Sequence, residues 1–325
     1  MINIAVIGVG SMGQNHARVL FNSDHSKLVA IADTNTEQAH RIARKYNTKA
    51  YTSYKEMLEK EQIDAISIAT PTKFHKDCAL HAISLKKHVL IEKPIAANEQ
   101  DAQEIINAAQ KNKVLVMIGH IERFNAAIIE LKKRLNAGEL GDIYKIEVDR
   151  IGPFPERITD VGVITDLSVH DIDIINYLTG AKLKRIYAET QQRLHPAYED
   201  SVTALLTYDN GMLGVLNINY LSPTKVRQIS IFGKRGMFKV NYLTQELFFY
   251  ENKSFGATDW NSVSEGDIKI INVPKKEPLQ AELEHFLNAI EKKQQVLVTG
   301  EDGLYALQIA QLIQRSAQEK KVLTL

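Results

Sequence analysis

Three glycines between an apolar strand and a helical pattern constrain this chain most. Gly8, Gly10 and Gly13 have the spacing G-x-G-x-x-G, directly after the strand-like run 2–7 and at the start of a helix. In that context the first glycine permits a tight turn, the second lets the backbone approach a pyrophosphate, and the third lets helix and strand pack closely. The helix N-terminus offers unpaired N–H groups and a partial positive charge to phosphates. The pattern predicts a dinucleotide-binding unit.

An acidic residue follows at the spacing that this fingerprint requires. Asp33 ends the second strand-like run, twenty residues beyond Gly13. Its carboxylate would accept hydrogen bonds from the adenosine ribose hydroxyls and repel a 2′-phosphate. Residues 34–36 supply no arginine to neutralise such a phosphate, so NAD is predicted rather than NADP. Ser11 and Met12 complete the turn and belong to the predicted cofactor site; the alternative is a glycine turn without a ligand.

The first 120 residues alternate strand-like and helical patterns with short connections. Such alternation predicts a doubly wound parallel sheet with helices on both faces. Strands are expected at residues 2–7, 28–32, 63–69, 88–91 and 114–118, and helices at 12–21, 36–46, 54–61, 74–85 and 99–111.

After a helix expected at 125–136 the pattern changes. A helix at 166–178 ends at Thr179-Gly180, a glycine stop, and Asp209-Asn210-Gly211 predicts a tight hairpin turn. The fold class is therefore α/β for an N-terminal Rossmann domain, residues 1–122, and α+β with a large, mostly antiparallel open sheet for residues 123–325. In the second domain we expect strands at 203–208, 212–220, 228–232, 237–242 and 246–250, an irregular polar surface stretch at 251–275, and closing helices at 279–292 and 301–319.

Length and charge narrow the class of protein. At 325 residues the chain exceeds one ordinary core, which predicts two domains. Its 40 basic and 39 acidic residues leave a formal charge of +1, so no field of one sign recruits nucleic acid or an anionic membrane. The single Cys78 excludes an internal disulfide and is expected to be a buried thiol. Neither a signal peptide nor a membrane span is expected, which predicts a cytoplasmic protein.

A charged triplet closes the apolar run 88–91. A short run of this kind predicts a buried strand, and Glu92, Lys93 and Pro94 follow it directly. Proline ends the strand and restricts the backbone of Lys93 to extended geometry, so the ammonium group is aimed from a rigid edge. The alternative is a solvated lysine at a strand end. Glu92 and Lys93 are included in the predicted cofactor site.

The strand before it ends in Ala-Thr-Pro-Thr, residues 69–72. This is the carboxyl edge, where open parallel sheets bind ligands. Thr70 and Pro71 are therefore predicted to line the cofactor, and His75 follows at the start of the next helix. A proline turn with Thr72 as helix N-cap explains that hydroxyl equally well and does not exclude the first interpretation.

Asp166 and His170 are four residues apart in the second half of the chain. On a helix their side chains would share one face, with about 5–6 Å between Cβ atoms. A carboxylate beside an imidazole orients it and supports its charged form, which suits a proton acceptor near neutrality. The alternative is a helix start with a satisfied core histidine. A metal site with Asp171 and Asp173 is less favoured, because successive helical positions point apart; no metal is predicted.

Together these segments resemble the glucose–fructose oxidoreductase / inositol dehydrogenase (Gfo/Idh/MocA) family over essentially the whole chain. The resemblance implies that Lys93, Asp166 and His170 form a catalytic set beside the nicotinamide. It also implies that the open sheet of the second domain serves oligomerisation, as a dimer or tetramer. The matching segments are 8–13 with His16, Asp33, Thr70-Pro71 with His75, 88–94 and 166–173.

A finer resemblance rests on residues 119–125, 152–157 and 198–200. These look like the nucleotide-sugar branch, particularly UDP-N-acetylglucosamine 3-dehydrogenases. Lys86 and Ala126 depart from the pattern, where glycine and proline are usual. Arg123 and Arg157 could meet a substrate diphosphate; surface or interdomain salt bridges are the alternative.

The resemblance implies an NAD-dependent dehydrogenase that oxidises a secondary ring hydroxyl of a sugar, here a nucleotide sugar. His170 is the candidate base, oriented by Asp166, and Lys93 stabilises the developing alkoxide. Which of Lys93 and His170 finally holds the proton stays open. The alternatives are an inositol or free-sugar dehydrogenase and a non-catalytic dinucleotide or sugar sensor. A sensor would be expected to lose Lys93 or His170, and this chain has both.

Overall fold

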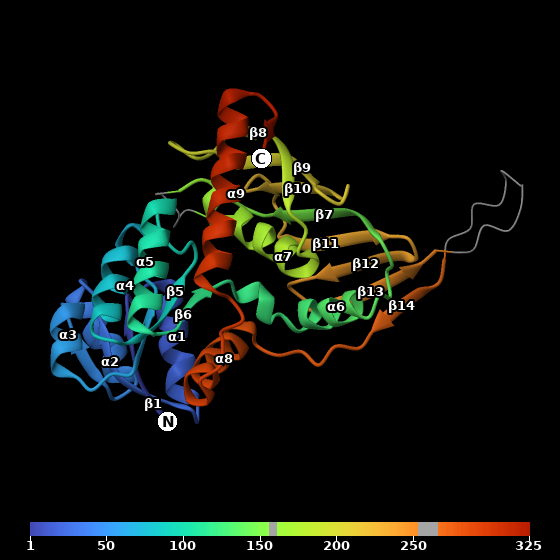
Figure 1. The fold of residues 1–325 in the computed structure, drawn as a ribbon. Coiled ribbons are helices and arrows are strands. Elements are labelled where there is room, and N and C mark those ends of the chain that lie inside the picture. The colour runs from blue at the N-terminus through green and yellow to red at the C-terminus, as the bar shows by residue number, and fades with distance from the viewer. Residues whose placement is uncertain (156–160, 253–265) are drawn as a thin grey trace, which may run out of the picture. The chain divides into compact units, whose positions relative to one another are not determined.

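The computed structural model describes residues 1–155, 161–252 and 266–325, and Figure 1 shows the course of the chain. Two compact units can be separated. The first contains Met1–Ile121 and Glu277–Gln308, and the second contains Glu122–Lys276 and Ile309–Leu325. A segment near the C-terminus therefore belongs with the N-terminal segment, which a single boundary after residue 122 does not capture.

The first unit is built on a six-stranded parallel sheet. Its strand order is β3-β2-β1-β4-β5-β6, so the order reverses between β1 and β4 and a ligand site is expected at their carboxyl ends. This confirms the predicted Rossmann fold class. The strands are β1 (Ile2–Ile7), β2 (Ser26–Ala32), β3 (Lys49–Tyr51), β4 (Ala65–Ile68), β5 (His88–Glu92) and β6 (Val116–Gly119).

Three helices of the first unit, α2 (Thr36–Lys45), α3 (Tyr54–Lys60) and α5 (Glu99–Asn112), begin at a polar side chain that caps them. Asn35, Ser53 and Asn98 each accept a hydrogen bond from a backbone N–H in the first turn of the helix that follows. The returning segment adds α8 (Pro278–Lys292), which packs on α1 and buries Leu283 and Phe286. The others are α1 (Ser11–Asn22), α4 (His75–Ser84) and the first part of α9 (Gly300–Glu319).

The second unit contains a nine-stranded, mostly antiparallel sheet in the order β14-β13-β12-β11-β7-β10-β9-β8-β15, which confirms the predicted α+β class. Within this second sheet, β7 and β10 form the only parallel pair among the described strands. β14 lies within the stretch 251–275, so the expectation of irregular structure was wrong for those residues. The strands are β7 (Ile143–Ile151), β8 (Leu183–Gln191), β9 (Ser201–Tyr208), β10 (Leu213–Asn219), β11 (Val226–Gly233), β12 (Gly236–Asn241), β13 (Glu246–Glu251), β14 (Ile268–Ile271) and β15 (Leu323–Thr324).

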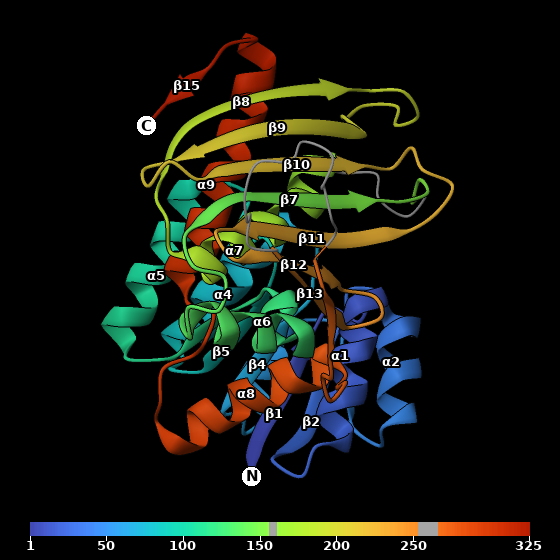
Figure 2. The ribbon, with the colours of Figure 1, turned by 90° about the vertical axis from the view of Figure 1, so that its right-hand side faces the viewer.

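The two faces of this sheet differ. Side chains on one face, such as Ala204 and Leu206, are buried, and α6 (Ala126–Asn136) packs against β12 and β13. The alternate side chains, such as Leu205 and Val215, remain partly exposed. Figure 2 looks onto the strands, with α7 (Val169–Thr179) behind them. Across the described residues, no helix has the length and apolar character that a membrane span requires.

Candidate active site

The glycine loop has the shape that the fingerprint predicts. Gly8 has a φ of +84°, and a Cβ there would lie 2.8 Å from the Ala69 carbonyl oxygen. At Gly13 a Cβ would lie 1.9 Å from the Gly8 carbonyl oxygen, so only glycine fits. At Gly10 a Cβ would meet no atom of the described residues within 4 Å. The first and third glycines therefore serve packing, and Gly10 leaves space above the loop.

Asp33 holds this loop from the neighbouring strand. Its Oδ2 accepts a hydrogen bond from the Val9 N–H at 2.8 Å, and its Oδ1 accepts one from the Asn35 N–H at 2.8 Å. Ser11 lies exposed at the first position of α1, where Gly10 provides no side chain to cap the helix. The helix N-terminus and an acidic side chain thus meet at the switch point of the sheet.

A cavity of about 470 Å³ opens beside the loop, at the carboxyl ends of β1, β2 and β4. The hydroxyl of Thr70 is buried there and has no hydrogen-bond partner among residues 1–155, 161–252 and 266–325. Apolar and aromatic walls with a carboxylate at one end suit the adenosine half of a dinucleotide. The walls include Gly10, Asp33, Thr52, Tyr54, Thr70, Pro71 and Phe74.

Sequence reasoning missed three of these wall residues. Thr52 directly follows β3 and Tyr54 begins α3. The sequence pattern did not predict β3, so the rule that ligands bind at the carboxyl ends of strands could not be applied to them. Phe74 lies in the turn before α4. Cys78 also lines the cavity, and burial raises the pKa of its thiol to about 12. It is therefore the neutral, buried thiol that the sequence predicts.

His75 lies beneath the cavity, with each ring nitrogen 2.9 Å from a backbone carbonyl oxygen. These oxygens belong to Thr70 and Pro94, which follow β4 and β5 respectively. Burial lowers the pKa of His75, which favours the neutral ring. A neutral ring has one N–H and donates a hydrogen bond to only one of these two oxygens, and a direct contact with the cofactor stays a prediction.

Lys93 follows the last residue of β5 and is partly exposed, at the same edge of the sheet. Its backbone N–H donates to Glu92 Oε2 at 3.2 Å. Glu92 Oε1 accepts a hydrogen bond from His16 Nε2 at 2.9 Å, and the Ser67 hydroxyl lies 2.7 Å from His16 Nδ1. Glu92 therefore supports the strand end from inside, and Lys93 stands at the surface of that edge.

Asp166 and His170 lie in the second unit, but not on one regular α-helix. Ile164–Ser168 form a π-helical turn, and α7 begins only at Val169. The chain is helical across the predicted range 166–178, but its first turn is π-helical, so the α-helical spacing predicted between Asp166 and His170 does not apply. Single π-turns occur frequently at functional sites.

Tyr220 fixes the Asp166 side chain. Its hydroxyl donates to Asp166 Oδ2 at 2.5 Å, from the residue that follows β10. Glu199 supports the same turn, because its Oε1 accepts a hydrogen bond from the Ile164 N–H at 3.2 Å. No local pattern points to Tyr220, since 54 residues separate it from Asp166. Next to this turn, Ser168 is fully buried and His170 is half-buried.

The other acidic residues of α7 are paired with arginines. Asp173 accepts hydrogen bonds from the Arg123 guanidinium, with the shortest at 2.6 Å, and Asp171 binds Arg150 at 2.5 and 2.9 Å. Arg123 is 3% exposed, so its charge is committed to this pair and the salt-bridge interpretation is favoured over diphosphate binding. Arg157 lies outside the described residues.

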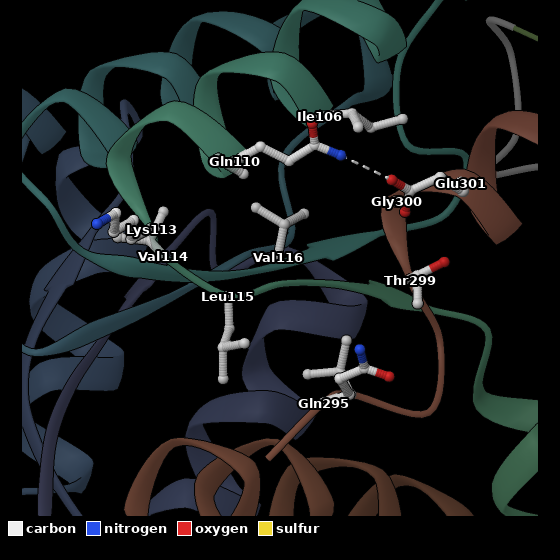
Figure 3. Close-up of a pocket in the computed structure, with 12 residues that line it drawn as sticks. Ile106, Gln110, Lys113, Val114, Leu115, Val116, Gln295, Thr299, Gly300 and Glu301 are labelled. Carbon is white, nitrogen blue, oxygen red and sulfur yellow. Dashed lines mark hydrogen bonds between the residues drawn. The ribbon is translucent and has the colours of Figure 1, made fainter. Parts of the chain in front are cut away.

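A second cavity of about 400 Å³ lies at the opposite, amino edge of the first sheet, where β6 begins. Figure 3 shows Gln110 of α5 and Glu301 of α9, joined by a hydrogen bond of 3.1 Å. None of the described residues predicted to act in catalysis or cofactor binding lines it. The candidate active site is therefore assigned to the carboxyl edge.

A Rossmann unit with such a cavity at the switch point of its sheet is the class of domain that binds dinucleotide cofactors. Family models agree: residues 2–120 match an oxidoreductase family, NAD-binding Rossmann fold, and residues 132–325 match its C-terminal alpha/beta domain. The chain belongs to the Gfo/Idh/MocA oxidoreductase family and is a sugar oxidoreductase that uses NAD.

Three relatives illustrate the range of this family. The chain is 32% identical, over 94% of each sequence, to the UDP-N-acetylglucosamine 3-dehydrogenase of Acidithiobacillus ferrooxidans, whose solved structure superposes with a TM-score of 0.88 over 98% of each chain. It is 24% identical to the myo-inositol 2-dehydrogenase of Thermotoga maritima, covering 98% of this chain and 97% of that one. The WlbA dehydrogenase from Bordetella pertussis, solved with NADH and UDP-GlcNAcA, is 23% identical, with a TM-score of 0.84 over 100% of this chain and 98% of that one.

Proposed function

We propose that this chain oxidises a secondary ring hydroxyl of a nucleotide sugar of the UDP-N-acetylglucosamine class. The observation that carries the proposal is the position of Lys93, at the carboxyl edge of the same sheet as the dinucleotide cavity. The similarity to a UDP-N-acetylglucosamine 3-dehydrogenase over 94% of each chain supports the substrate class.

The proposed roles follow from the chemistry of alcohol oxidation. An alcohol releases hydride readily only when its hydroxyl proton leaves, so a base and an oxyanion stabiliser are needed. His170 takes the proton, Asp166 orients His170, and Lys93 donates a hydrogen bond to the substrate oxygen. NAD, when bound, supplies the hydride acceptor. Lys93 lies in the first unit and the other two in the second, so their meeting around the substrate is part of the proposal.

The experiment is a substrate panel of UDP-sugars, inositols and free sugars, followed by the absorbance of NADH. We expect turnover with a UDP-N-acetylhexosamine. Lys93→Met and His170→Ala should each lower turnover by about 100-fold or more while leaving NADH binding nearly intact. Lys87→Met, directly before the amino end of β5, is the matched control and should keep wild-type turnover. Full activity of either active-site variant would remove that residue from the mechanism.

An inositol dehydrogenase is the second candidate, because a myo-inositol 2-dehydrogenase is also similar over nearly the whole chain. Turnover of inositols with inert UDP-sugars would favour it. Binding of NAD and a sugar without any turnover would favour the sensor.

We also propose that the partly exposed sheet face of the second unit binds a second copy of this chain. One row of facing side chains crosses it from strand to strand and mixes apolar with charged groups. That row is Tyr187, Leu205, Val215, Glu147, Ser230, Lys239 and Phe248. Large apolar groups on an otherwise polar face are typical of a protein–protein contact.

A further inference from the structure

Three ionisable side chains of the first unit meet in its interior, behind the strand end that carries Lys93. His16 comes from α1, Glu92 from the last position of β5, and Glu282 from α8. One ring nitrogen and one oxygen of each carboxyl group lie within 4.8 Å of one another. His16 and Glu282 are completely buried, and Glu92 is 9% exposed.

Two of these three side chains, His16 and Glu92, have hydrogen-bond partners. His16 lies between Ser67 and Glu92, and Glu92 also accepts the Lys93 N–H. Glu282 differs, because neither of its carboxyl oxygens has a hydrogen-bond partner within the part of the chain that the structure describes. A buried carboxyl group in that condition requires a neutralising partner, since an isolated buried charge is strongly unfavourable.

The surroundings of Glu282 favour its neutral form. Burial raises the pKa of Glu282 well above its ordinary value, and the Glu92 charge raises it further. At Glu92 burial acts in the same direction, but the His16 hydrogen bond and nearby positive charge, including that of Lys93, outweigh it and lower the pKa. Two neighbouring carboxyl groups whose pKa values move apart in this way are arranged to share one proton, and the directions favour Glu282 as its holder.

Charged groups close to α8 have partners elsewhere. Arg18 of α1 pairs with Glu277, and the N-terminal ammonium of Met1 pairs with Glu291 at 3.2 Å. Glu284, two residues beyond Glu282, accepts a hydrogen bond from Gln280 at 2.8 Å. Among the described residues, the ionisable groups that cluster with Glu282 are Glu92 and His16.

We propose that Glu282 is a positioning residue: it remains a neutral carboxylic acid at neutral pH and directs its O–H toward the Glu92 carboxylate. Glu92, so held, keeps its other oxygen on the Lys93 backbone N–H. A divalent cation would satisfy the same three groups. It would, however, have to displace the hydrogen that lies between His16 Nε2 and Glu92, 2.9 Å apart. A proton on Glu282 therefore accounts for this cluster and leaves the hydrogen bond between His16 and Glu92 in place.

The direct test is infrared difference spectroscopy of wild type against Glu282→Gln. A protonated carboxyl group has a C=O stretching band that an ionised one lacks. We expect this band in the wild type, lost in Glu282→Gln, at both about pH 6 and about pH 8. A spectrum without the band at about pH 6 and pH 8 would overturn the proposal.

Stability against pH gives an independent readout that needs no substrate. A carboxyl group whose pKa is higher in the folded chain binds more protons when folded, so its contribution to stability falls as pH rises above the ordinary value of 4.5. Glutamine has no such dependence. Relative to wild type, Glu282→Gln should gain about tenfold in the folding equilibrium constant per pH unit, or about 100-fold between about pH 5.5 and 7.5. Urea denaturation followed by circular dichroism measures this ratio.

Three controls separate the alternatives. Glu284→Gln removes a partly exposed carboxylate of the same helix. It should change the folding equilibrium constant by the same factor at both pH values. Glu282→Ala should lower turnover, by about tenfold, and Glu282→Gln should recover most of it, because the amide keeps a donor and an acceptor. The proposal would be overturned if the ratio of the folding equilibrium constants of Glu282→Gln and wild type did not change with pH. It would also be overturned if the purified wild type contained stoichiometric metal that Glu282→Gln lacks.

Discussion

Asp33 performs two tasks with one carboxylate. It holds the glycine loop through the Val9 and Asn35 N–H groups, and it forms the acidic end of the dinucleotide cavity. Each carboxylate oxygen has lone pairs left for a ribose hydroxyl. Cofactor selectivity and loop geometry therefore depend on the same side chain.

Replacing Asp33 separates these tasks. Asp33→Ala should weaken NADH binding by about 10- to 100-fold, as expected for lost hydrogen bonds to a charged group, and reduce the preference over NADPH. Asp33→Asn keeps one acceptor oxygen and should mainly reduce the preference. Titration of NADH and NADPH by fluorescence measures both constants. Glu37→Ala, an exposed acidic neighbour in the first turn of α2, should leave the preference unchanged, and an unchanged preference in Asp33→Ala would refute the ribose contact.

Residues whose role depends on chain neighbours could be predicted, and those that depend on tertiary contacts could not. Gly8, Gly13 and Asp33 act through a local strand–turn–helix unit, whose spacing is visible in the sequence. Tyr220 reaches Asp166 across 54 residues, and His16 reaches Glu92 across 76. Only the folded arrangement of strands and helices brings such pairs together.

At the scale of elements, the π-helical turn before α7 carries Asp166. The turn is braced from two sides, by Glu199 at its start and by Tyr220 on Asp166 itself. A turn of this kind places side chains differently from an α-helix. The Tyr220 hydrogen bond then decides where the Asp166 carboxylate points.

Tyr220→Phe removes that hydrogen bond and little else. We expect turnover to fall by about tenfold, because the Asp166 carboxylate loses a fixed orientation, with a smaller change in substrate KM. Steady-state kinetics and a thermal melt separate this effect from unfolding. Tyr144→Phe, which removes the hydroxyl of an exposed tyrosine at the start of β7, is the matched control. Wild-type turnover in Tyr220→Phe would mean that the hydrogen bond has no catalytic role.

Helices and strands were predicted correctly where their buried side chains recur at a regular spacing along the sequence. Helices with polar caps and strands with continuous apolar runs were predicted close to their observed bounds. β7 was missed because Arg150 takes a core-facing position on it, paired with Asp171, and interrupts the apolar alternation. β3 has only three residues, too few for a periodic signal. The π-turn has no composition of its own and was predicted as α-helix.

At the scale of the whole molecule, the uncovered sheet face should determine the assembly. Leu205 is 47% exposed and lies in the central row of that face. Leu205→Glu would place a charge in the contact between copies, so we expect a smaller species than wild type at the same concentration. Light scattering after size exclusion gives the mass. Gln103→Glu, on exposed α5, adds the same charge elsewhere and should leave the mass unchanged; equal masses for all three proteins would rule out this face.

The division into two units has a consequence for the order of events on the ribosome. The unit that begins with the glycine loop is completed only when α8 and the start of α9 have been translated, because Glu277–Gln308 belong to it. The second unit is completed later still, when β15 pairs with β8. Domains usually fold one after another as they emerge. Here a nascent chain released between residues 121 and 277 would have finished neither unit, so truncated products should be cleared by proteases rather than persist as half-enzymes.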